Sequence, residues 1–259
     1  MPGTSYTCLY VELKHLMAYI KLNGAPLYRD PNGVGLKSVR TVNEWIMPGK
    51  NQISTFWHWP TEVAYKPGIA RANVSVFVSD PESTIPKPLH ILAQHRWPMP
   101  DKPEAYPYES SSIFELPGNP PTRLWVDAEP LPDKLSPRDR QTALLLVEQL
   151  ADAIERQNLD DIMVLVDYKI REDALANGHD LEHLRQSMRE QYQFVLEEPG
   201  LKRQVLPADS LNCMVIGGNK LARVQQANWE EALIYHSESC RFKFDIYVAK
   251  IEGKWLIVR

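Results

Sequence analysis

The stretch Glu129-Pro-Leu-Pro-Asp-Lys-Leu-Ser136 divides the 259-residue chain into two parts of different composition. Before Ser136 lie 18 of the 21 prolines and five of the seven tryptophans. After it the sequence takes on helical spacing and then strand-like patterns. A break of this kind marks a domain boundary. We therefore expect a β-domain over residues 1–130 that ends in a proline-rich arm (98–130), a linker over 131–136, and a second domain over 137–259.

The second domain begins with helix signals. Ser136-Pro137 supplies an N-cap serine and a proline at the first helical position. Apolar residues then recur at helical spacing up to about residue 157, from 159 to 177, and from 181 to about 198. Asn158 and Asp180 are the N-cap candidates of the second and third helices. The strands expected after them span residues 204–206, 212–216, 221–226, 232–236, 241–251 and 255–258. Helices followed by an antiparallel meander predict an α+β fold with the helices on one face of the sheet.

The first domain has short strands between proline- and glycine-rich turns. Asn23-Gly24 is a strong hairpin signal because both residues tolerate positive φ. In the run 52–59, alternate residues are apolar, which is typical of a half-buried strand. Further strand candidates are residues 9–22, 42–46, 74–78 and 89–94. This spacing predicts an all-β sandwich. The arm is expected to be irregular except for a short strand at 123–126. Its many prolines have no backbone N–H to donate to a neighbouring strand.

Two fragments carry resemblances to known folds. Lys21-Leu-Asn-Gly-Ala-Pro-Leu-Tyr28, followed by Val42-Asn-Glu-Trp-Ile-Met-Pro-Gly-Lys-Asn51, resembles galactose-binding-like jelly-roll sandwiches, and this resemblance transfers no binding residue. The first helix of the second domain, the segment Asn158-Leu-Asp-Asp-Ile-Met-Val-Leu165 and the closing hairpin of residues 242–258 resemble the nuclear-transport-factor-two-like cone fold. That family includes ketosteroid isomerase, scytalone dehydratase and many non-enzymatic members, so the resemblance implies a fold and leaves the activity open.

The resembled enzymes place an Asp, His or Tyr inside the cone, where desolvation tunes its pKa. The catalytic candidates here are Tyr168, Tyr192, His236 and Asp245, and Asp167, Tyr235 and Tyr247 complete the set. Alternation along 241–249 places Asp245 opposite the phenylalanines, which favours an exposed or salt-bridged role over a catalytic base. No catalytic or phosphate-binding motif is present to select among them.

The first domain offers a different kind of site. Exposed tryptophans stack on sugar rings, and the candidates are Trp57, His58, Trp59, His95 and Trp97. A tryptophan on an alternating strand is more commonly a core residue. His58 and His95 could meet only if their strands are adjacent.

Composition limits the partners and cofactors. The net charge is −4 and neither half is basic, which argues against a nucleic-acid partner. No apolar run is long enough for a membrane span. Three widely spaced cysteines favour a reducing compartment, so we expect a cytoplasmic protein, although Cys213 and Cys240 could pair. His179 and His183 have helical spacing but lack a third ligand, so we expect neither a metal site nor a cofactor.

The leading hypothesis is a non-enzymatic protein that binds an unknown protein or small molecule. The alternatives are a cofactor-free lyase, isomerase or hydrolase that uses the cone pocket, and a carbohydrate-binding module. We also expect a homodimer through the uncovered face of the second sheet. Aromatic residues beside arginine are typical of an interface. The candidates for this face are Tyr235, Arg241, Tyr247 and Trp255.

Overall fold

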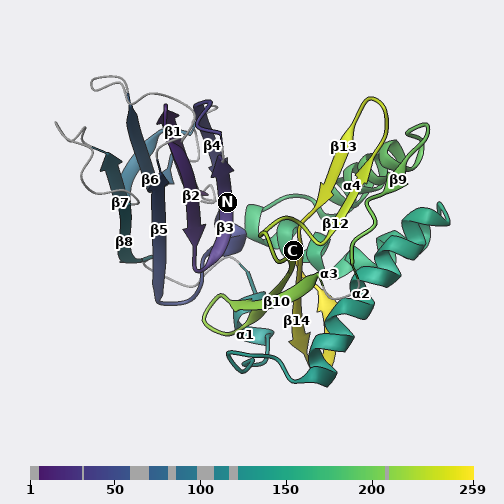
Figure 1. Ribbon diagram of the computed structural model, residues 1–259. Coiled ribbons are helices and arrows are strands. Elements are labelled where there is room, and N and C mark those ends of the chain that lie inside the picture. The colour runs from purple at the N-terminus through teal and green to yellow at the C-terminus, as the bar shows by residue number, and fades with distance from the viewer. Residues whose placement is uncertain are drawn as a thin grey trace. The chain divides into compact units, whose positions relative to one another are not determined.

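The computed structural model describes residues 6–30, 32–58, 70–80, 86–97, 108–116, 122–207 and 210–259. The chain divides into two compact units, Met1–Pro121 and Thr122–Arg259. The described part is rich in β-strands and contains four α-helices and several antiparallel sheets. Each unit has its own set of elements (Figure 1).

The first unit contains two four-stranded antiparallel sheets, with strand orders β4-β1-β6-β7 and β3-β2-β5-β8 (Figure 1). The strands are β1 (Tyr6–Lys14), β2 (Met17–Leu22), β3 (Ala25–Asp30), β4 (Leu36–Thr41), β5 (Lys50–His58), β6 (Arg71–Ser79), β7 (Pro88–Trp97) and β8 (Tyr108–Glu115). Strand β5 shows the predicted alternation, since Ile53, Thr55 and Trp57 are buried while Gln52 and Phe56 are exposed.

Two turns of the first unit are joined through a pair of buried asparagines. Asn23 and Gly24 form the predicted two-residue hairpin turn, with φ of 53° and 82°. The Asn23 side-chain amide donates to Asn51 Oδ1 at 2.8 Å, and its oxygen accepts from the backbone N–H of Gln52 at 2.8 Å. Asn51 in turn accepts from Met47 N and donates to the Met47 and Gly49 carbonyls. The Asn23-Gly24 turn and the segment Met47–Asn51 therefore share one hydrogen-bond network.

The structure corrects the sequence prediction at one place early in the chain and at two places in the arm. Residues 42–46 are not a strand, because Asn43–Trp45 form a 3₁₀ turn. Residues 108–115 form strand β8, which pairs with β5 along its whole length. Residues 124–127 form the short helix α1 (Leu124–Asp127), where a strand was expected. Strand β8 has no proline of its own, so the prolines on both sides of it did not prevent ladder formation.

The second unit contains helices α2 (Pro137–Glu155), α3 (Leu159–Asn177) and α4 (Leu181–Leu196). The predicted caps are confirmed: Ser136, Asn158 and Asp180 each accept a backbone N–H from the residue three positions later. Gly178 ends α3 in the left-handed conformation, with φ of 63°. Local capping thus fixes both ends of the long central helix.

The strands of the second unit form two antiparallel sheets, with orders β10-β11-β14-β15 and β13-β12-β9. They are β9 (Lys202–Arg203), β10 (Leu211–Ile216), β11 (Leu221–Gln226), β12 (Leu233–His236), β13 (Arg241–Phe244), β14 (Ile246–Ile251) and β15 (Lys254–Ile257). The predicted strand 241–251 is interrupted at Asp245, so its two halves belong to different sheets. The first predicted strand, 204–206, lies instead at 202–203.

Helices α2 and α3 pack on the same side of the four-stranded sheet (Figure 1). The core between them contains Val147, Leu150 and Ile154 of α2, Val166 and Ile170 of α3, and Ala222, Val224, Ile246 and Val248 of the strands. Residues of α3, α4 and β13 line the candidate site beside this core.

None of the helices in the described segments is both long and apolar enough to span a membrane.

Candidate functional site

A pocket of about 370 Å³ lies in the second unit, between α3 and α4 on one side and β13 on the other. Its volume is within the lower range of small-molecule sites. Its apolar lining consists of Leu150, Val166, Met188, Tyr192, Val195, Phe242, Phe244, Ile246 and Ile257. Its polar and charged lining consists of Lys169, Gln191, Lys243, Asp245 and Arg259.

Aromatic rings form one wall of the pocket. The ring of Tyr192 stacks on Phe244 with a centroid distance of 6.1 Å and an interplanar angle of 10°. The ring of Tyr235 packs edge to face against the same Phe244 ring, with a centroid distance of 6.0 Å. Burial raises the pKa of Tyr192 to about 12, so its phenol keeps its proton at neutral pH. The wall is therefore a fixed apolar surface with one hydroxyl donor.

Lys169 of α3 is the unusual residue of the pocket. Its side chain is half-buried and makes no hydrogen bond or ion pair within the described part of the chain. Burial lowers the pKa of the Lys169 ammonium, and the nearby Arg259 acts in the same direction. Asp173, whose effect is larger than that of Arg259, and Asp245 oppose this shift, but burial is the largest cause and the pKa is lowered. A lysine with this environment is suited to meet an anionic or an electrophilic group.

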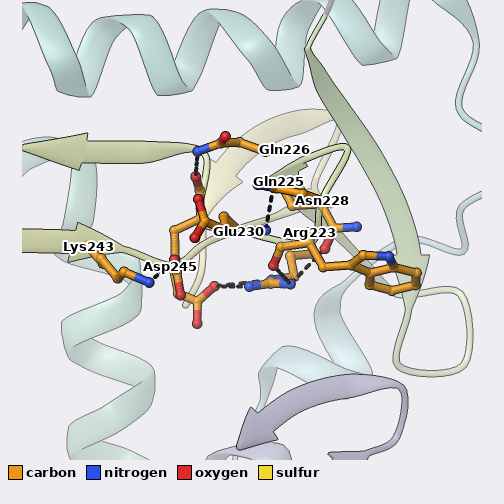
Figure 2. Close-up of polar contacts among 9 residues, drawn as sticks. Arg223, Gln225, Gln226, Asn228, Glu230, Lys243 and Asp245 are labelled. Atoms are coloured by element: carbon orange, nitrogen blue, oxygen red, sulfur yellow. Dashed lines mark hydrogen bonds and ion pairs between the residues drawn. The ribbon is translucent and has the colours of Figure 1, made fainter. Parts of the chain in front are cut away.

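Asp245 is held by a buried arginine from the neighbouring strand. Arg223 of β11 donates to Asp245 Oδ1 through Nη2 at 2.8 Å and through Nε at 3.1 Å. Figure 2 shows the same guanidinium reaching Gln225, whose side-chain oxygen accepts from Arg223 Nη1 at 2.6 Å. Asp245 was expected to be exposed or salt-bridged, and it is both partly exposed and paired with Arg223. Arg223 therefore holds the Asp245 carboxylate at the point where the chain passes from β13 to β14.

The pocket brings together two of the four catalytic candidates. Tyr192 and Asp245 line it, whereas Tyr168 and His236 do not. His236 is exposed at the end of β12, and Tyr168 is half-buried, with a pKa that burial raises. Asp167 is engaged in ion pairs with Arg171 and Arg185 on the helix surface.

The four interface candidates belong to two different sheets. Arg241 is exposed at the start of β13 and forms an ion pair with Glu230. Tyr235 lies on the helix side, where its hydroxyl donates to the Ala151 carbonyl of α2 at 3.2 Å. Trp255 also lies on that side, since its indole Nε1 donates to Asp139 at 3.2 Å. Tyr247 lies on the other side, beside Arg223. The interruption at Asp245 also places Arg241 and Tyr247, expected on one strand, in two different sheets.

The candidates for sugar binding are largely interior residues. Trp57 and Trp97 are buried, so the described tryptophans of these strands do not form an exposed stacking platform. Trp59 lies outside the described residues. His58 pairs with Met17 of β2, whereas His95 belongs to a strand of the other sheet. The two histidines are therefore not on adjacent strands.

His95 instead forms a polar contact between the two sheets of the first unit. Its Nδ1 lies 2.8 Å from Thr55 Oγ1 on β5, and its Nε2 lies 2.9 Å from Ser112 Oγ on β8. Burial lowers the pKa of the His95 imidazole, which favours the neutral ring. A neutral ring can donate at one nitrogen and accept at the other, as two hydroxyl partners allow.

We expect this histidine to make the first unit acid-sensitive. Because the pKa is lower in the folded state, the unfolded chain takes up the proton first as the pH falls. The contribution of His95 to the free energy of unfolding is therefore complete above its unfolded-state pKa of about 6.5. It declines as the pH falls below that pKa, by at most about 1.4 kcal/mol per pH unit. Denaturant melts between pH 8 and pH 5 measure this. His95→Gln should flatten the profile, whereas His236→Gln, at an exposed site, should leave it unchanged. Equal profiles for wild type and His95→Gln contradict the assignment.

The other sequence candidates carry no site. Cys8, Cys213 and Cys240 are all free thiols. His179 precedes the N-cap Asp180, so it lies outside the helix that contains His183. Within the described ranges, no three His, Cys, Asp or Glu side chains gather as metal ligands.

Sequence reasoning missed Lys169, although the sequence holds a signal for it. Ile162, Val166 and Ile170 form the buried stripe of α3, and Lys169 lies three residues after Val166 on that stripe. A lysine at an apolar helical position indicates either a buried charge or a cavity.

No family model, curated protein or solved structure matches this chain.

Proposed function

We propose that the chain is a non-enzymatic binding protein whose second unit holds a small, largely apolar molecule with an acidic group. The observation that carries the proposal is the half-buried Lys169 ammonium in a pocket otherwise walled by aromatic and aliphatic side chains. An apolar cavity with a few placed polar groups is the usual form of a small-molecule site.

The charges of the pocket favour an anion. Lys243 is paired with Glu231 at 3.1 Å, and Asp245 is paired with Arg223. Lys169 is a cationic side chain of the lining without such a pair among the described residues, and it favours a carboxylate or similar group. The acidic group of a ligand would lie near Lys169, and its apolar body would lie against Tyr192 and Phe244.

The architecture we infer for this function is a β-sandwich followed by an α+β cone of the nuclear-transport-factor-two-like type. Helices on one side of a sheet that changes direction at Asp245 support this reading of the second unit. Two four-stranded sheets linked through His95 support the sandwich. In such a cone, the helices and sheet enclose the ligand pocket.

Binding is tested with 2-naphthoate and its neutral counterpart 2-naphthalenemethanol. We expect naphthoate to bind and to stabilise the second unit, by about 2.7 kcal/mol at a hundredfold excess over Kd. Lys169→Met should weaken naphthoate about tenfold, which corresponds to one charge-assisted contact. The same variant should change naphthalenemethanol binding little. Isothermal titration calorimetry measures both affinities.

A matched pair of tryptophan variants locates the bound molecule. Met188→Trp fills the pocket and should abolish binding of both compounds, whereas Val164→Trp, on the exposed side of α3, should not. Binding that survives Met188→Trp places the ligand elsewhere, and absence of binding to the wild-type chain contradicts the proposal.

A further inference from the structure

We propose that Lys169 is a nucleophilic amine that forms an imine with an aldehyde or ketone bound in the second-unit pocket. This inference rests on the proposed binding function and adds a second ligand class for the same pocket, a carbonyl compound with an aromatic or branched apolar body. Such a compound reacts with the free amine of Lys169, whereas the acidic ligand meets its ammonium form. The inference also assigns a covalent role to a side chain that the binding function uses only as a charge.

The position of Lys169 supports the assignment. The lysine projects from the buried stripe of α3 into a pocket whose walls are mainly carbon. Its amine makes no hydrogen bond or ion pair with any residue of the described segments. The other lysine of the lining, Lys243, is exposed and forms an ion pair with Glu231. Of these two amines, Lys169 is the one that a bound carbonyl carbon can approach without first breaking an ion pair.

The electrostatic surroundings favour the reactive form of the amine. Nucleophilic lysines are activated by desolvation in apolar pockets or by a neighbouring cation. Lys169 has both, since burial lowers the pKa of its ammonium and Arg259 lowers the pKa further. The carboxylates of Asp173 and Asp245 act in the opposite direction, and the net change is a lowered pKa. A larger share of the free base is therefore present at neutral pH than in an exposed lysine.

The reaction needs no co-reactant. The free amine of Lys169 adds to the carbonyl carbon, and a proton moves from nitrogen to oxygen to give a carbinolamine. The carbinolamine then loses its hydroxyl group and the second nitrogen proton as water, which leaves a carbon–nitrogen double bond. The phenol of Tyr192 lines the same pocket and keeps its proton, so it is the hydroxyl placed to donate to the carbonyl oxygen.

The test is reductive trapping with benzaldehyde and sodium cyanoborohydride at pH 7, followed by peptide mass mapping. We expect a benzyl adduct on Lys169 to form about tenfold faster than on the exposed Lys254, because the pocket holds the aldehyde beside an amine whose free base is favoured. Lys169→Arg should remove the fast adduct, whereas Lys254→Arg should leave it unchanged. Melting curves establish that both variants are folded.

Competition in the wild-type chain separates this inference from the proposed function and does not depend on any variant. An excess of 2-naphthalenemethanol, which has no carbonyl group, should slow labelling of Lys169 and leave Lys254 unaffected. If naphthalenemethanol binds but Lys169 is labelled no faster than Lys254, the imine is wrong and the binding function stands. If labelling is fast but unaffected by the competitor, the carbonyl compound does not react in the pocket and the inference is also wrong.

Discussion

Replacing Asn51 by alanine is expected to destabilise the first unit by about 3–5 kcal/mol. Asn51 is buried, and it accepts from Met47 N and Asn23 and donates to two backbone carbonyls. Each buried group left without a partner costs about 1–3 kcal/mol, and the truncation removes partners from several at once. Guanidinium titration with hydrogen exchange read on β2 and β5 measures the loss in this unit.

Asn32→Ala is the control for Asn51→Ala. Asn32 lies in an exposed turn, and its side chain makes no hydrogen bond within the described residues. We expect a change within about 0.5 kcal/mol there. A loss below about 1 kcal/mol for Asn51→Ala would show that the two turns are held by other contacts.

The second large effect is expected at the Arg223–Asp245 pair of the second unit. Asp245→Ala should cost about 2–4 kcal/mol, because it leaves a buried guanidinium without its carboxylate. The lower end of that range reflects the partial exposure of Asp245, which weakens the pair. The double variant Arg223→Met/Asp245→Ala should recover most of the loss, since the buried charge is then absent as well.

A double-mutant cycle on Arg223 and Asp245 checks this prediction. Glu182→Ala breaks an exposed ion pair with Arg185 and should change stability by less than about 1 kcal/mol. If the double variant is less stable than Asp245→Ala alone, Arg223 contributes mainly through its packing on Tyr247, and the electrostatic explanation fails.

Local signals carried the successful part of the sequence prediction. Ser136, Asn158 and Asp180 mark helix starts through a hydrogen bond that reaches three residues along the chain. The Asn23-Gly24 turn depends on the φ preferences of two neighbouring residues. Such features need no knowledge of distant partners, so the three long helices and the hairpin were predicted.

Features that depend on distant partners were not predictable. Strand β8 pairs with the edge of β5, which is distant in the sequence. The prolines on both sides of β8 gave the sequence pattern of an irregular segment. The split of the expected strand 241–251 into β13 and β14 falls at Asp245, which is bonded to Arg223 of another strand. Likewise, Lys169 becomes a site residue only because α4 and β13 leave a space beside it.

The pairing of β1 also determines when the first unit can fold. This strand is hydrogen-bonded to β4 on one edge and to β6 on the other. Strand β5 is likewise paired on one edge with β8, which comes much later in the chain. Pairings between distant segments are slow because long loops must close before any contact compensates for the lost entropy. During synthesis, β5 therefore stays without one neighbour until residue 115 has left the ribosome. The capped helices of the second unit form from local contacts, so the half that is made first has the slower folding topology.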